Sequence, residues 1–218
     1  MRAPTGADVP LLALAVLGIG ASAPLITVIA APALAIALWR NVFGTMALMP
    51  WALARVSRDL VTVWTDPQLR RVVLLAGAAL AAHFATWVPA VTLTTVAAAT
   101  ALVAVQPVWN ALLARAAGAT VSGRVWLGIG IAVLGALLLT GLDLGGDPRA
   151  LLGNVLALLG GVAAAGYVAL GARAREQVST TAYSVSCYAV TSVLLLAVCL
   201  VLARRVATYA EHIRLDED

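Results

Sequence analysis

Residues 83–110 read HFATWVPAVTLTTVAAATALVAVQPVWN, and the rest of the chain is best interpreted from this stretch. Two apolar runs of helical length meet in it at the polar corner TLTT, and each run contains a proline. His83 and Trp87 are four residues apart, as are Gln106 and Asn110, so each pair lies on one face of its helix. A buried imidazole or carboxamide is costly in lipid, and in a membrane these side chains are therefore functional candidates.

The composition indicates that the surroundings are a membrane. Of the 218 residues, 62% are hydrophobic and only 11% are charged, whereas soluble domains keep roughly a quarter of their residues charged. The mean hydropathy is +0.99. The charged residues cluster between long apolar runs, which is typical of polytopic α-helical membrane proteins. The chain contains no lysine, and its arginines form no contiguous basic face for nucleic acid.

Apolar runs long enough to cross a bilayer recur about seven times. The predicted spans are 9–29, 33–54, 72–91, 96–114, 125–142, 151–171 and 181–203. Residues 55–71 are predicted to be a polar connection in which Asp66-Pro67 marks a helix start. The tail, 204–218, is charged and cannot insert. The predicted fold class is therefore all-α, a polytopic transmembrane helical bundle of about seven spans.

The arginines predict a cytoplasmic N-terminus, because cytoplasmic loops carry an excess of positive charge. In this orientation Arg149 is the one arginine in an outer loop before the tail. The arginines on the cytoplasmic side would be Arg2, Arg55, Arg58, Arg70, Arg71, Arg115, Arg124, Arg173 and Arg175. The tail, with Arg204, Arg205 and Arg214, falls outside and is the discordant element. The expected location is a bacterial-type cytoplasmic (inner) membrane.

A weak internal repeat relates the first two spans to the last two. A shift of 148 residues lays Gly18 on Gly166 and Arg40 on Tyr188. Five spans separate the two starts, and an odd number reverses the orientation in the membrane. The second unit would then be an inverted repeat, which is a feature of many secondary transporters. Chance similarity between apolar segments is the alternative explanation.

Several short motifs follow one another along the chain in a characteristic order. They are Leu38-Trp39-Arg40, His83-Phe84 with Trp87, Thr94-Thr95-Val96-Ala97, Gln106-Pro107 with Leu112, Trp126-Leu127-Gly128 to Gly135, and Asn154 to Tyr167 followed by Gly171-Ala172-Arg173. In this order the chain resembles the EamA-type branch of the drug/metabolite transporter superfamily over about residues 9–203. The resemblance implies two inverted five-helix repeats that move small metabolites, amino acids or drugs by alternating access. No cofactor is expected.

Two departures from the family pattern affect the predicted organisation. The glycine-glutamate pair that usually follows the fourth helix reads Gly118-Ala119 here, and helices eight to ten of the pattern have no counterpart. The predicted domains are a first five-helix repeat (1–142), two helices of a second repeat (143–203) and the charged tail (204–218). We therefore expect a truncated or frameshifted product, or a chain that needs a second copy or a second-half partner. The glycines at 160–166 are expected to offer such a partner a close-packing seam.

The candidate substrate-binding residues each have a structural alternative. Arg40 lies about 10 Å below the outer end of its helix and either snorkels to the headgroups or binds a carboxylate in the interior. His83 is a helix-to-helix hydrogen bond or a proton relay, and Trp87 is an interface anchor or a cavity wall. Gln106 either joins helices or forms a binding corner beside Pro107, which frees the carbonyl of Val103. The full set is Arg40, His83, Trp87, Gln106, Asn110 and Tyr188.

No enzymatic chemistry is expected. The predicted spans hold no aspartate or glutamate, so no serine, histidine and carboxylate can be assembled within them. A phosphate-binding loop needs a lysine, which the chain lacks. The glycines from Gly18 to Gly20 match a dinucleotide-binding pattern, but they lie inside an apolar span without the preceding strand that this motif requires. Cys187 and Cys199 are about 18 Å apart on one helix, and no metal-ligand spacing is present. The predicted function is solute transport, and the alternative is a non-transporting membrane subunit or remnant that only packs or dimerises.

Overall fold

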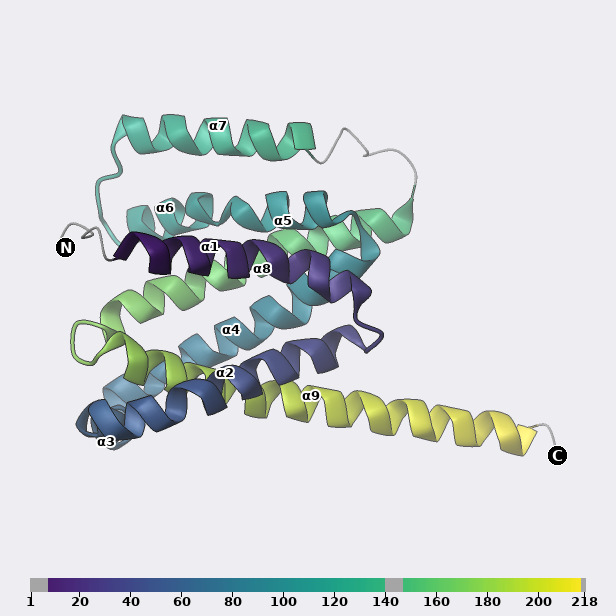
Figure 1. Ribbon diagram of the computed structural model, residues 1–218. Helices are drawn as coiled ribbons and strands as arrows, with labels where there is room; N and C mark the ends of the chain where they lie inside the picture. The colour runs from purple at the N-terminus through teal and green to yellow at the C-terminus, as the bar shows by residue number, and fades with distance from the viewer. Residues whose placement is uncertain (1–7, 140–146, 217–218) are drawn as a thin grey trace.

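The computed structural model describes residues 8–139 and 147–216, and within these ranges it contains helices and no strand (Figure 1). Five segments are long and apolar enough to cross a membrane: α2, α4, the α5–α6 pair, α8 and the part of α9 up to Arg204, while α1 and α7 contain shorter apolar helices. This confirms the predicted polytopic bundle. The helices are α1 (Asp8–Val28), α2 (Ala33–Arg55), α3 (Ser57–Thr65), α4 (Pro67–Leu93), α5 (Val96–Ala104), α6 (Gln106–Ala116), α7 (Gly123–Leu139), α8 (Pro148–Ala174) and α9 (Thr180–Asp216).

Helices α4 and α8 form the centre of the bundle and make the most extensive helix pair in it. Helix α9 packs against α2 and α4, and α5 and α6 pack against α8. Helix α7 lies at the edge of the bundle and contacts α5, as Figure 1 shows. Residues 83–110 therefore belong to α4, α5 and α6, the helices that surround α8.

Small residues allow α8 to approach its neighbours closely. A side chain at Gly160 would lie 3.2 Å from Cβ of Trp87 on α4, and one at Gly161 would lie 3.4 Å from the carbonyl oxygen of Val103 on α5. Gly160 and Gly161 are both buried. For Gly160 and Gly161, the expectation of a seam for a missing partner is therefore wrong. The seam is occupied by α4 and α5 of the same chain, because close contact between backbones is how membrane helices gain packing energy.

Residues 55–71 contain a helix where the sequence predicted a polar connection. Helix α3 forms because its apolar residues repeat at helical spacing, and Val63 on its inner face is fully buried beside Leu69 and Tyr183. The predicted helix start at Asp66-Pro67 is present. The carboxylate of Asp66 accepts a hydrogen bond of 2.7 Å from the amide of Leu69, and Pro67 is the first residue of α4.

The fourth predicted span is divided in two at Val105. Helix α5 ends at Ala104 and α6 begins at Gln106, so the helix is interrupted two residues before Pro107. The cause is that proline lacks the amide hydrogen that the carbonyl of Val103 would accept. Pro89, by contrast, lies inside an uninterrupted α4.

Two polar side chains on α9 donate hydrogen bonds to backbone carbonyls of neighbouring helices. Thr191 donates a hydrogen bond of 3.0 Å to the carbonyl of Gly77 on α4, and Tyr183 donates one of 3.0 Å to the carbonyl of Tyr167 on α8. The rings of Tyr167 and Tyr183 are stacked. Polar groups in a bilayer must find partners within the protein, so these bonds attach α9 to the centre of the bundle.

Candidate functional site

Arg40, on α2, points into the bundle and lies over aromatic rings of α4. Its guanidinium carbon is 5.2 Å from the ring centroid of Phe84 and 5.8 Å from that of Trp87. Its Nη1 atom is buried and has no hydrogen-bond partner. A guanidinium that snorkelled to the headgroups would leave these rings, so the structure favours the interior position of Arg40. Aromatic faces stabilise the cation without using its N–H donors.

His83 is the next member of this group. Its Nδ1 atom is 2.9 Å from the carbonyl oxygen of Gly160 on α8, and its ring is stacked on that of Trp87 with centroids 5.9 Å apart. A carbonyl only accepts hydrogen bonds, so Nδ1 carries the proton, and Nε2 of the neutral ring is left as an acceptor. One nitrogen therefore joins α4 to α8, as the structural alternative predicted, and the other is available for a further contact.

Trp87 is a buried wall of this group and not an interface anchor. Only 8% of its surface is exposed, and its Nε1 atom is buried without a partner. The ring is stacked with the imidazole of His83 and also lies under the guanidinium of Arg40. An unpaired indole N–H beside an unpaired guanidinium nitrogen gives two donors in one apolar region. Two such donors are suited to a ligand with acceptor atoms.

Tyr188, which the internal repeat paired with Arg40, approaches α2 from α9. Its ring lies 3.2 Å from the position that a side chain at Gly44 would take, so α9 and α2 are in close contact there. Tyr188 is also close enough to Arg40 for an electrostatic interaction. The structure therefore brings together Arg40, His83, Trp87 and Tyr188, together with Phe84, from three helices. We call these five residues the Arg40 cluster.

Gln106 and Asn110 are not part of the Arg40 cluster. Gln106 is half-buried at the first position of α6, and among the described residues its carboxamide has no hydrogen bond. Asn110 lines a separate open cavity of about 560 Å³ between α6 and α8, together with Leu113 and Arg173. The four-residue spacing correctly placed each pair on one face. It could not show that Asn110 lines a different cavity from the one that reaches Arg40.

An open cavity of about 550 Å³ gives access to Arg40 from the turn between α1 and α2. Its walls are almost entirely apolar, and Arg40 supplies the charged group. The lining residues are Ile29, Ala31, Ala35, Ile36, Trp39, Arg40 and Phe43. A single cation in an apolar cavity fits a ligand that has an apolar body and one anionic group.

Two residues that contact the candidate side chains were not singled out as candidates. Phe84 follows His83 and reads as an ordinary apolar residue, but its ring lies under Arg40. Gly160 supplies the carbonyl that holds His83. The sequence signals were a place in a family motif and, for Gly160, a place among glycines expected to allow close packing. Neither signal names the partner, which lies 44 positions away for Phe84 and 77 for Gly160. Among the described residues no group of three or more histidine, cysteine, aspartate or glutamate side chains could hold a metal ion.

Comparison with known families identifies the class of protein to which this bundle belongs. Residues 8–141 match the model of the EamA-like transporter family. The chain therefore belongs to the EamA-like transporter family, and it is a multi-pass membrane protein of transporter type. A search of the curated proteins and a search of the solved structures each returned no match.

Proposed function

We propose that the chain is a secondary carrier that binds a small solute with an anionic group, such as an amino acid or an organic acid, at the Arg40 cluster. The observation that carries the proposal is the guanidinium of Arg40, which is held inside the bundle over Phe84 and Trp87 with Nη1 unpaired. A buried unpaired charge is costly to maintain in a membrane. Binding of a carboxylate would remove this cost, because the guanidinium donates to carboxylates through two parallel hydrogen bonds.

The neighbours of Arg40 would add selectivity. The Nε2 atom of His83 would accept a hydrogen bond from the solute, and Nε1 of Trp87 would donate one. The apolar walls around Trp39 and Phe43 would hold the body of the solute. Alternating access would come from movement of α2 and α9 against the α4–α8 pair, since the cluster lies between these helices.

We further propose a bacterial-type inner membrane with a cytoplasmic N-terminus. Support comes from arginines at one end of the bundle. Arg58 lies on α3, Arg55, Arg70 and Arg71 flank this helix, and Arg173 and Arg175 lie at the end of α8. The bond from the amide of Ser179 to Asp59 joins these two regions. An excess of arginine marks the cytoplasmic side.

The test is uptake into proteoliposomes that contain the purified chain, with amino acids, organic anions and organic cations offered under a proton gradient. Saturable uptake of an anionic solute by the wild type, and a loss of about tenfold or more in Arg40→Gln, are expected. Arg40→Lys keeps the charge but not the paired donors and should retain part of the activity.

The matched control is Arg55→Gln. Arg55 also stacks on an aromatic ring, with its guanidinium carbon 5.1 Å from the centroid of Trp51, but it lies at the exposed end of α2. This variant should transport as the wild type does. Equal uptake by wild type and Arg40→Gln would contradict the role of Arg40. No uptake of any solute class by folded protein would favour a membrane subunit that packs without transporting.

A further inference from the structure

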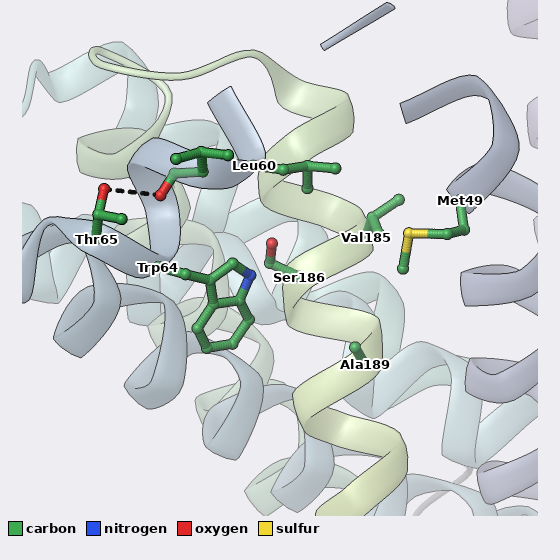
Figure 2. Close-up of a pocket in the computed structure, with 8 residues that line it drawn as sticks. Met49, Leu60, Trp64, Thr65, Val185, Ser186 and Ala189 are labelled. Atoms are coloured by element: carbon green, nitrogen blue, oxygen red, sulfur yellow. Dashed lines mark hydrogen bonds between the residues drawn. The ribbon is translucent and has the colours of Figure 1, made fainter. Parts of the chain in front are cut away.

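A second cavity, of about 410 Å³, lies between α3 and α9 (Figure 2). This is the arginine-rich end of the bundle, which carries Arg55, Arg58, Arg70, Arg71, Arg173 and Arg175. It shares no residue with the Arg40 cluster, and its walls are almost entirely apolar. The lining residues are Met49, Leu60, Val61, Trp64, Thr65, Val185, Ser186 and Ala189. Figure 2 shows the indole of Trp64 extending from α3 toward Ser186 on α9. The proposed transport site does not use this cavity.

Ser186 is the unexplained polar group in this cavity. The residue is 1% exposed, and its hydroxyl oxygen has no hydrogen-bond partner. Hydroxyls in helices usually donate to the carbonyl four residues earlier. Thr65 in the same cavity does so to Val61 at 2.8 Å, and Ser192 does so to Tyr188 at 2.8 Å. A buried hydroxyl that forgoes this bond carries a desolvation cost, which a ligand with an acceptor oxygen would remove.

The depth of the cavity matches the upper part of a lipid molecule. Ser186 is six residues into α9, or about 9 Å from the start of the helix, and Ala189 is about 13 Å from it. Helix α3 is a short amphipathic helix outside the predicted spans, and Trp64 is 41% exposed on it. Tryptophan is enriched at the headgroup level of membranes. The cavity thus begins at the headgroup level, passes Ser186 at the depth of ester carbonyls and continues beside Ala189 at the depth of acyl chains.

Arginines stand at the rim of this cavity. Arg70 donates a hydrogen bond of 3.3 Å from Nη1 to the carbonyl of Trp64. Arg58 precedes Val61 by one helical turn and Thr65 by two, so it lies on the same face of α3. The two nearby carboxylates, Asp59 and Asp66, keep their charge while they accept from the amides of Ser179 and Leu69. The net charge at this end of the bundle is still positive, because Asp59, Asp66 and Glu176 face six arginines: Arg55, Arg58, Arg70, Arg71, Arg173 and Arg175. A positive surface suits a phosphate.

We propose that this cavity is a binding site for an anionic phospholipid. One acyl chain lies between Trp64 and Ala189, the ester carbonyl accepts a hydrogen bond from Ser186, and the phosphate contacts Arg58 and Arg70. A neutral apolar metabolite would fill the cavity without using the arginines. A zwitterionic phospholipid would fill it too, but its own cation would oppose them. Charge complementarity at the rim thus selects the anionic lipid.

The first experiment is native mass spectrometry of the purified full chain in detergent micelles with equal amounts of phosphatidylglycerol and phosphatidylcholine. The wild type is expected to retain phosphatidylglycerol about tenfold more than phosphatidylcholine. Ala189→Phe fills the cavity and should reduce bound phosphatidylglycerol about tenfold. Val193→Phe is the control, because Val193 is one turn further along α9, is 67% exposed and lies outside the cavity.

The second experiment separates the headgroup from the acyl chain. Arg70→Gln should bring retention of phosphatidylglycerol down to that of phosphatidylcholine, whereas Arg124→Gln, an exposed change at the start of α7, should not. Ser186→Ala should weaken both lipids about fivefold, the value of one hydrogen bond.

Three results would overturn the proposal. They are equal retention of both lipids by the wild type, undiminished phosphatidylglycerol on folded Ala189→Phe, and equal effects of Arg70→Gln and Arg124→Gln. If Ala189→Phe does not fold, the two arginine variants decide the question, because both replace exposed side chains.

Discussion

The Nδ1 atom of His83 on α4 lies 2.9 Å from the carbonyl oxygen of Gly160 on α8. This contact joins the two central helices and also sets the tautomer of the imidazole beside Arg40. It depends on the small residue at 160, because a larger one would hold the two backbones apart. Packing of the bundle and chemistry of the candidate site therefore depend on the same pair of residues, and the following experiments separate the two.

Replacement of His83 should affect stability as well as solute binding, whereas replacement of Gln106 should not affect stability. His83→Phe removes the bond to Gly160 and is expected to cost about 1 kcal/mol of stability. Gln106→Leu breaks no hydrogen bond among the described residues, so the melting temperature should stay near that of the wild type. Thermal unfolding in detergent measures both variants. A stable His83→Phe protein would show that the bond to Gly160 contributes little.

Glycines along α8 should differ sharply in their tolerance of alanine. A Cβ atom at Gly153 would lie 2.9 Å from the backbone amide nitrogen of Thr94, which cannot move aside easily. Gly153→Ala is therefore expected to destabilise the protein by about 1–3 kcal/mol. At Gly166 the nearest atom is 3.9 Å away, on Ala79, so Gly166→Ala should be neutral or slightly stabilising. Unfolding midpoints of both variants compare the two sites directly, and a neutral Gly153→Ala would contradict the close approach of α8 to the 92–95 corner.

The orientation in the membrane can be tested with single cysteines. Cys187 and Cys199 are free thiols, so the background protein carries Cys187→Ala and Cys199→Ala to remove them. A cysteine at Thr92, which is exposed at the end of α4, should react with an impermeant maleimide added outside intact cells. A cysteine at Ser122, exposed before α7, should react only after the membrane is opened. The reverse pattern would show that the N-terminus is external.

Acidification should weaken the attachment of α3 to α9. Hydrogen bonds from the hydroxyl and the amide of Ser179 hold the pKa of Asp59 below its ordinary value of 3.8, and the amide contact measures 2.8 Å. Because the folded-state pKa is depressed, the stabilisation is fully present above the unfolded pKa and is lost as the pH falls through the lower, folded value. Asp59→Asn should thus be less stable than the wild type at pH 7, and the difference should shrink below about pH 4. Melting curves against pH measure it, and a difference that is independent of pH would contradict the role of the carboxylate.

The hydropathy of the sequence was sufficient for the fold class. Long apolar runs must become helices in a bilayer, because no water satisfies the backbone there. Hydropathy alone therefore predicted the polytopic bundle, and the order of the motifs then indicated the family. The Asp66-Pro67 start is equally local, since a carboxylate caps the amides of the next turn. The amphipathic α3 was missed because charged residues such as Arg58 and Asp59 indicated a polar connection, although the segment also has a short apolar face.

The sequence by itself determined which residues were costly to bury, and therefore which ones were candidates. Arg40, His83, Trp87 and Gln106 stood out because polar groups in lipid need partners. Only the tertiary structure decided which of them meet. The rings of Phe84 and Trp87 lie under Arg40, and the carbonyl of Gly160 holds His83. Helix α6, which follows the break at Val105, places Asn110 in a different cavity. The physical reason is that hydropathy depends on each residue alone, whereas the meeting of side chains depends on how closely backbones approach. In this bundle that approach is set by glycines such as Gly153 and Gly160, whose effect appears only when the facing helix is in place.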